Sequence, residues 1–223
     1  MNTGSLSPSC KTLIAAFGFL AASISSPALA HPHVFAEARL EVETTIDGTI
    51  AELRNVWRFD EVFSSSVVID FDTNNNLVMD PDELKIVGSI VKESLEEFGY
   101  YTNLSGNGRD ISVLPPEQMI ADFQDGQLLL IFAVKPAEPM PLTGKLSVGV
   151  YDPTMYAAID FPTDGDLLVT GPSADKCETN VVRPDPDKVL AENQASLTEA
   201  FFNDPGGNDI SKLFATRIEI NCK

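Results

Sequence analysis

The sequence is short of histidine and of glycine-rich loops, and each shortage excludes a class of function. Both histidines, His31 and His33, stand near the N-terminus, whereas a Ser-His-Asp or Cys-His mechanism needs a histidine held inside a pocket. No glycine-rich segment has the spacing of a phosphate-binding loop. Paired carboxylates could transfer protons, but among 33 acidic residues no pair stands out. We therefore expect a binding protein and not an enzyme.

Basic residues are also few, with 15 against 33 acidic ones, and the formal net charge is −18 at pH 7. This charge argues against nucleic acid and anionic membrane surfaces as partners, and it suits cations. Acidity also keeps an exported protein soluble, so the charge alone identifies no ligand.

Long hydrophobic runs are missing as well, and the one short run lies near the N-terminus. Lys11 precedes an apolar stretch over 12–24, and Ala28-Leu29-Ala30 has the small–x–small pattern of a cleavage site. The apolar stretch is too short to span a bilayer comfortably. We therefore expect residues 1–30 to be a cleaved signal peptide, and the mature protein to begin at His31 in a bacterial periplasm without a membrane span.

The expected mature chain keeps two of the three cysteines, Cys177 and Cys222. In an oxidising compartment an isolated pair usually forms a disulfide, which would attach the C-terminal strand to the rest of the fold. Two free thiols bound to a metal are the alternative, although the spacing is not that of zinc ligands.

The hydrophobic pattern predicts an α+β fold that begins with a hairpin and two helices. Val34–Thr45 alternates apolar and polar residues, Asp47-Gly48 marks a turn, and Ile50–Trp57 is the expected return strand. Four-residue spacing of apolar residues predicts one helix over 60–69 and another over 84–98. Between them lies a polar loop.

The later part of the chain is predicted to be an antiparallel β-rich region with one C-terminal helix. That helix is expected over Asp187–Phe202, with Leu190, Leu197 and Phe201 facing inward. We expect 31–223 to form a single α+β domain, with a possible subdivision near 100–110. Strands are expected over 127–134, 144–151, 156–161, 167–170 and 216–222.

The polar loop has the spacing of a twelve-residue calcium site. Its oxygen donors at positions 1, 3, 5, 7, 9 and 12 would be Asp72, Asn74, Asn76, the carbonyl of Val78, Asp80 and Glu83. This spacing suits a hard cation, because a short loop must curl around it to supply six to eight oxygens.

Two features weaken the calcium interpretation of this loop. Position 6, normally glycine, is Leu77, for which a left-handed conformation costs about 1–2 kcal/mol. A metal-free interpretation is also available, because Asp80, Pro81 and Glu83 have the order of an acidic capping box at a helix start. The residues leave both interpretations open.

The two histidines offer a partial site for a transition metal. Cleavage after Ala30 would leave a free amine on His31 beside two imidazoles, and such nitrogens suit copper, nickel or zinc. Pro32 has no amide N–H, so the square-planar motif that uses the intervening amides cannot form. Other groups would have to complete the site, and the alternative is a frayed terminus with two solvated imidazoles.

Several short motifs follow one another in a characteristic order along the chain. They are His31-Pro-His-Val-Phe35, Trp57-Arg-Phe-Asp-Glu61, the loop Asp72–Glu83, Tyr100-Tyr101-Thr102, Val150-Tyr-Asp-Pro-Thr154, Cys177, Phe201-Phe202 and Arg217–Cys222. Together with the export signal, they resemble the DUF1007 family of periplasmic proteins. Family loops commonly carry Asp-Gly where this chain has Asn76-Leu77.

The resemblance implies a function in metal transport. Family members are described as periplasmic components of uncharacterised transport systems, beside or fused to nickel/cobalt-type permeases, and one branch is linked to zinc acquisition. We therefore expect an accessory protein that handles zinc, nickel or cobalt for an inner-membrane permease through His31 and His33. The alternative is a calcium-stabilised adaptor, with an EF-hand-like loop at Asp72–Glu83 and no transition-metal role.

Overall fold

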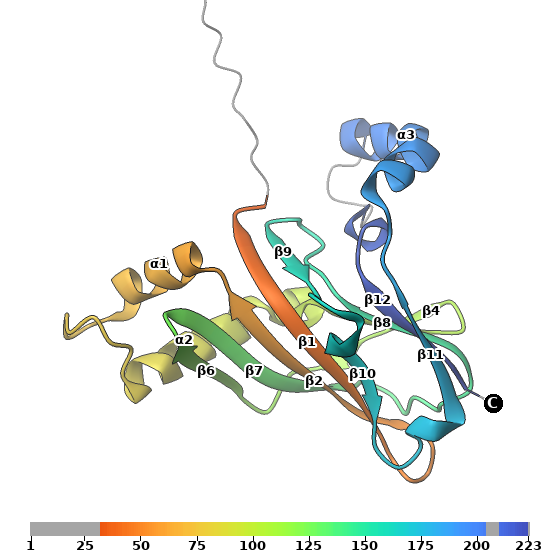
Figure 1. The fold of residues 1–223 in the computed structure, drawn as a ribbon, viewed down its shortest axis with the longest axis horizontal. Coiled ribbons are helices and arrows are strands. Elements are labelled where there is room, and N and C mark those ends of the chain that lie inside the picture. Colours follow the sequence, from red (N-terminus) through yellow and green to blue (C-terminus); the bar gives the residue numbers. More distant parts are fainter. Residues whose placement is uncertain (1–31, 204–209, 223) are drawn as a thin grey trace, which may run out of the picture. The chain divides into compact units, whose positions relative to one another are not determined.

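The computed structural model describes residues 32–203 and 210–222, which contain two β-sheets and three α-helices (Figure 1). The predicted α+β class is confirmed. The predicted signal peptide, residues 1–30, lies outside the described residues. No helix in the described part of the chain is long and apolar enough to cross a membrane.

The larger sheet is built around the predicted hairpin. β1 (Val34–Thr44) and β2 (Ile50–Phe59) pair antiparallel, and Gly48 in their turn has φ +75°. The other strands of this sheet are β5 (Val113–Leu114), β6 (Met119–Gln124), β7 (Gln127–Pro136), β9 (Ala157–Asp160) and β10 (Leu167–Thr170). Their order is β10–β1–β2–β7–β5, with β9 also beside β1 and β6 also beside β7.

Two strands correct the prediction that the later strands are antiparallel. β9 and β10 both run parallel to β1, with registers that begin at Val34↔Ala157 and Leu40↔Leu167. They share the one edge of β1 that β2 leaves open, one after the other along the strand. Alternation of apolar and polar residues is the same in either direction, so the sequence pattern could not reveal the direction of pairing.

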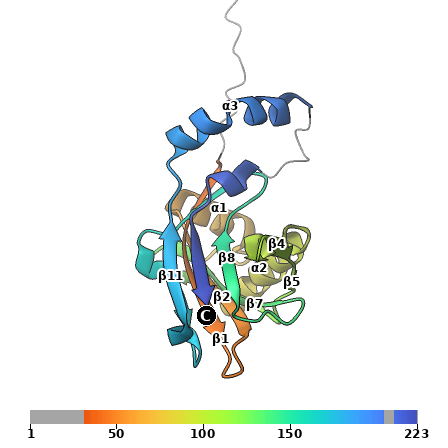
Figure 2. The ribbon, with the colours of Figure 1, turned by 90° about the vertical axis from the view of Figure 1, so that its right-hand side faces the viewer.

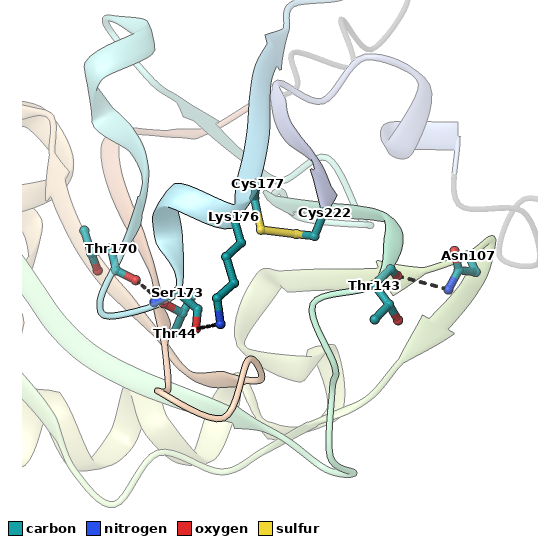
Figure 3. Close-up of a disulfide and its surroundings, with 8 residues drawn as sticks. All are labelled: Thr44, Asn107, Thr143, Thr170, Ser173, Lys176, Cys177 and Cys222. Atoms are coloured by element: carbon teal, nitrogen blue, oxygen red, sulfur yellow. Dashed lines mark hydrogen bonds between the residues drawn. A yellow bond between two sulfur atoms is a disulfide. The ribbon is translucent and has the colours of Figure 1, made fainter.

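The smaller sheet contains the last strand of the chain (Figure 2). Its strands are β3 (Thr102–Gly106), β4 (Arg109–Ile111), β8 (Gly144–Val150), β11 (Cys177–Val182) and β12 (Arg217–Cys222), in the order β11–β12–β8–β3–β4. Cys177 and Cys222 are register partners on β11 and β12 and form the predicted disulfide (Figure 3). Cys222 is buried, as its alternation predicted.

Hydrogen bonds connect the end of β1 to the segment that precedes this disulfide (Figure 3). The Thr44 hydroxyl donates to the carbonyl oxygen of Thr170 at 2.8 Å and accepts from the N–H of Ser173 at 3.1 Å. The ammonium of Lys176 donates to the Ser173 hydroxyl at 3.2 Å. The two Thr44 bonds attach the end of β1 to the end of β10 and to the segment between β10 and β11, more than a hundred positions away in the sequence.

The first two predicted helices are confirmed with shifted ends. α1 (Glu61–Phe71) packs against β7, and α2 (Pro81–Ser94) packs against β6. Gly88 permits this close approach, because a Cβ built on it would lie 2.2 Å from the carbonyl oxygen of Met119. α2 ends earlier than predicted, and Gly99 with φ +58° follows it. Short 3₁₀ helices lie at Glu96–Tyr101, Asp164–Asp166, Ala174–Lys176 and Ile210–Leu213.

The predicted C-terminal helix is present as α3 (Pro186–Asn203). Its predicted inward face is wrong at Leu190, whose side chain is 50% exposed. The side chains of Leu197 and Phe201 are outside the described ones.

One hydrophobic core contains residues from both sheets and from α1 and α2. Its largest fully buried side chains include Trp57, Tyr100 and Phe161. Trp57 contacts Phe132 edge-on at 4.9 Å between ring centroids and stacks on Tyr101 at 6.0 Å. The core therefore includes residues on both sides of positions 100–110.

Candidate functional site

The first candidate site lies where β1 begins, at His33. Its backbone N–H donates to the carbonyl oxygen of Tyr156 at 2.8 Å, and the N–H of Val34 donates to the same oxygen at 3.3 Å. The His33 side chain is exposed, and its ring centroid lies 5.2 Å from that of Tyr156. The other predicted ligand, His31, lies outside the described residues. One of the two predicted imidazoles is therefore at the surface, next to the backbone hydrogen bonds that join the start of β1 to Tyr156.

The loop that carries Tyr156 was not predicted as part of a site. Asp152 at its start is 2% exposed, and its carboxylate accepts from the N–H and hydroxyl of Thr154, both at 2.7 Å, and from the N–H of Ala157 at 2.9 Å. The Tyr101 hydroxyl is a further donor to this carboxylate. Burial raises the pKa of Tyr101, and the Asp152 charge raises it further, so the phenol stays protonated and able to donate.

A second carboxylate fixes the start of β1 from the side of α1. Asp60 is the N-cap of α1, where its Oδ1 accepts from the N–H groups of Val62 at 2.8 Å and Phe63 at 2.9 Å. Its Oδ2 accepts from the N–H of Phe35 at 3.0 Å. Burial alone would raise the pKa of Asp60, but these backbone donors outweigh it and the pKa is lowered. The charged form is thus the one that holds β1 to α1.

The second candidate site is the loop between α1 and α2. Its backbone makes a sharp turn where calcium loops have glycine, with φ +63° at Leu77 and +59° at Asn75. The Asp72 carboxylate holds this turn, because it accepts from the N–H of Leu77 at 2.7 Å and of Asn76 at 3.2 Å. The Leu77 side chain is 82% exposed, so the backbone bonds and not packing set its conformation.

Three of the predicted oxygen donors converge within this loop. The side-chain nitrogens of Asn74 and Asn76 donate to Oδ2 of Asp80 at 2.6 and 3.2 Å. The amide oxygens of these asparagines accept from the backbone N–H groups of Asn76 and Val78. A half-turn of either amide would direct its oxygen toward a cation beside Asp80, but it would break the bond that this oxygen accepts from the backbone.

Glu83 points instead into hydrogen bonds at the start of α2. It is 4% exposed, and its Oε1 accepts from the N–H and the hydroxyl of Thr73, each at 2.8 Å. Its Oε2 accepts from the N–H of Asp80 at 3.0 Å, and α2 begins at Pro81. The Asp80 N–H and the Thr73 hydroxyl lower the pKa of Glu83. The metal-free interpretation of the sequence thus matches the contacts of Glu83.

The predicted loop ligands therefore divide into two sets. Asn74, Asn76 and Asp80 lie together, whereas Asp72 and Glu83 accept from separate backbone donors. Over residues 32–203 and 210–222, no three His, Cys, Asp or Glu side chains form a group that could hold a metal ion. Calcium coordination by the full predicted set would require Glu83 to share its oxygens between Thr73, Asp80 and the cation.

A groove of about 590 Å³ lies on the larger sheet and contains none of the residues of either candidate site. Its lining includes Arg54 and Lys135, which form ion pairs with Glu52 at 2.7 Å and Glu117 at 2.9 Å. The cations of the groove are thus engaged with carboxylates of the same surface. This groove does not add a ligand to either candidate site.

The motifs of both candidate sites fall within a known family. The sequence profile of the family described as "Protein of unknown function (DUF1007)" matches residues 16–222. The chain belongs to this family. No curated protein matches it. The resemblance to DUF1007 drawn from the motifs is confirmed, and the family description names no ligand or activity.

Proposed function

We propose that this DUF1007 protein is a periplasmic accessory protein that handles a divalent transition metal (zinc, nickel or cobalt) for an inner-membrane transporter. The observation that carries the proposal is the placement of His33. Its backbone is fixed by the Tyr156 carbonyl at 2.8 Å, while its imidazole is exposed at the start of β1. Neutral imidazole is a good ligand for these three metals, and His31 would supply a second one two residues away.

A site with few protein ligands suits transfer rather than storage. Metal held by two imidazoles and a terminal amine keeps open coordination positions. A ligand of the transporter can therefore bind the metal before the metal dissociates from this protein. The formal charge of −18 supports the same role, because an acidic surface raises the local concentration of cations. The family resemblance supports a metal permease as the partner.

The test compares naturally exported and processed protein with its His31→Ala/His33→Ala variant. Elemental analysis and competition titration with zinc, nickel and cobalt measure metal content and affinity. We expect the wild type to bind one metal ion more tightly than a small histidine-containing peptide, and the variant to lose this binding. Wild-type affinity no better than that of the peptide would contradict the proposal.

The loop between α1 and α2 favours a second candidate, a calcium-stabilised adaptor. Two observations support it: the left-handed turn at Leu77, held by Asp72, and the convergence of Asn74, Asn76 and Asp80. Calcium bound there would be coordinated by these oxygens. The coordination would link the end of α1 to the start of α2. In this candidate the histidines have no role.

Calcium is expected to raise the thermal unfolding midpoint of the wild type and not that of an Asp72→Asn/Asp80→Asn variant. A ligand present at 100 times its dissociation constant stabilises a protein by about 2.7 kcal/mol. Asp70→Asn is the matched control, because Asp70 is exposed at the end of α1 and supplies no predicted ligand. Thermal scans with calcium and with chelator measure the shift. Identical midpoints for the wild type in both solutions would exclude this candidate.

A further inference from the structure

The larger sheet buries one side in the core and exposes apolar side chains on the other. On β7, Leu130 and Phe132 are buried, whereas Ile131 between them is 36% exposed. Alternation of side chains along a strand puts Ile131 on the opposite side of the sheet, which we call the outer face. Leu114 and Ile120, at 47% and 45% exposed, line the groove on this face together with Ile131. Exposed apolar residues that adjoin one another within a polar rim mark interaction surfaces.

An apolar row crosses the outer face from strand to strand. Ile120 on β6 is the register partner of Ile131 on β7, and Ile131 is the partner of Val56 on β2. Ala133, the next residue of β7 on this face, also lines the groove, and its side chain is much smaller than that of Ile131. The face therefore has a tall apolar side chain directly beside a short one.

Charged side chains flank the apolar row, and their signs balance. The groove is lined by three basic and three acidic residues, namely Arg39, Arg54, Lys135, Glu41, Glu52 and Glu117. The whole chain carries a formal net charge of −18, which makes its copies repel one another. Because the charges of the groove cancel, a second copy can approach this face without that repulsion from the facing residues.

The order of the charges along β1 is self-complementary. Arg39 and Glu41 lie on the outer face two positions apart, beside Val56 and Arg54 of β2. A two-fold axis that crosses the strands between these positions reverses the order of residues along each strand. Arg39 of one copy then faces Glu41 of the other, and Glu41 of the first faces Arg39 of the second. Opposite charges are thus paired twice in one interface.

The same two-fold axis also fits the apolar row. Through the shared registers, Ile131 lies level with Arg39, and Ala133 lies level with Glu41. The axis therefore places Ile131 of each copy opposite Ala133 of the other, so that large and small side chains interdigitate between sheets about 10 Å apart. Sheets packed in this way are inclined by about 30°, and the pairs nearest the axis stay opposed.

We propose that the outer face of the larger sheet is a self-association surface, on which two copies of this chain form a reversible two-fold dimer. Arg39 then lies opposite Glu41, and Ile131 lies opposite Ala133. Arg39 already pairs with Glu41 of its own chain at 3.0 Å, but its side chain is 50% exposed. A guanidinium has five N–H donors, so Arg39 can bind a second carboxylate without releasing the first.

The size of the face is the reason to expect a reversible dimer. The face spans β6, β7, β2 and β1. With strands about 4.8 Å apart and about six residues along each strand, it measures about 20 Å by 20 Å. Such an area is small for a permanent dimer and suits one that exchanges with the monomer.

The test is analytical ultracentrifugation of naturally exported and processed protein over a concentration series. A chelator is present, so that no metal can bridge two copies. We expect the wild type to pass from monomer to dimer as its concentration rises. Ile131→Lys would place an unpaired charge at the centre of the interface, and we expect the dissociation constant of the dimer to rise by about 10-fold or more. Ile69→Lys is the matched control, because Ile69 is 82% exposed on α1, which packs on the core side of β7 through Val67.

Charge reversal tests the register of the dimer. Arg39→Glu would put two pairs of like charges into the interface, and we expect it to weaken dimerisation by about 10-fold or more. Arg39→Glu/Glu41→Arg exchanges the two signs, so each pair across the axis is again opposite, and the wild-type affinity should return. Urea titrations at concentrations where each protein is monomeric check that all variants are folded.

Each contrary outcome is specific. A wild type that stays monomeric at millimolar concentration would overturn the proposal. A dimer that Ile131→Lys leaves intact, or that Ile69→Lys weakens as much, would overturn it as well, because the interface would then lie elsewhere. A double variant as weak as Arg39→Glu would overturn the two-fold register. The proposal does not rest on the N-terminal metal site, and neither test decides the other.

Discussion

Replacing Cys177 and Cys222 together by alanine is expected to lower the free energy of unfolding by about 2–5 kcal/mol. The disulfide closes a loop across a sequence separation of 45 and joins β11 to β12. β11 is at the end of the smaller sheet, with β12 as its neighbour, so it has one ladder of hydrogen bonds to hold it. Without the bridge, the unfolded chain gains the freedom that the closed loop denies it. Denaturant titration of both proteins measures the difference.

A reductant provides the matched control for this prediction. It should bring the wild type to the midpoint of the double variant and leave the variant itself unmoved. Wild-type midpoints that coincide with and without reductant would show that the bridge does not contribute to stability.

Replacing Asp152 by alanine is expected to lower the free energy of unfolding by about 3 kcal/mol or more. The side chain is 2% exposed, and its removal leaves donors on Thr154, Ala157 and Tyr101 without their charged acceptor. Each buried polar group left unsatisfied costs about 1–3 kcal/mol, and water cannot easily reach this place to replace the carboxylate.

Asp160→Ala is the control for the Asp152 variant. Its side chain is 74% exposed and lies 3.7 Å from Arg183, so its removal should change stability by no more than about 0.5 kcal/mol. Urea titrations of the three proteins give the comparison. Equally small losses of unfolding free energy in both variants would mean that the hydrogen bonds of the Asp152 carboxylate do not stabilise the fold.

Local patterns in the sequence predicted the elements, and they failed where pairing depends on distant residues. The period of two in Val34–Thr45 and the turn at Asp47-Gly48 predicted the hairpin, and apolar spacing predicted α1 and α2. The parallel placement of β9 and β10 had no local signal, because their partner β1 is more than a hundred residues earlier. The exposed Leu190 was assigned inward because periodicity shows which face is apolar and not whether another element covers it.

The two candidate sites also differ in how much of each could be predicted from local sequence. The candidate loop ligands could be predicted from the sequence because calcium loops are contiguous, so their spacing is visible in one stretch. Tyr156 was missed as a neighbour of His33, since that contact exists only through the parallel register of β1 and β9. The one local signal was the motif Val150–Thr154, which by itself indicates a turn. The burial of Asp152 within it is a property of the assembled fold.

The position of β1 in the larger sheet also constrains how the chain folds as it is made. Its hairpin partner β2 follows directly in the sequence. Its other edge is covered by strands from much later in the chain, and contacts with that part of the chain close very long loops. The Thr44 bonds to Thr170 and Ser173, for example, span 126 and 129 positions. Pairings of this kind gain free energy only after the loop has closed, so proteins rich in them fold slowly. A nascent chain that stops short of residue 170 therefore carries an open strand edge, and such edges promote aggregation. Among the described strands, β1 is made first and is among the last to have both edges paired, so chaperones that cover exposed edges would protect the unfinished chain.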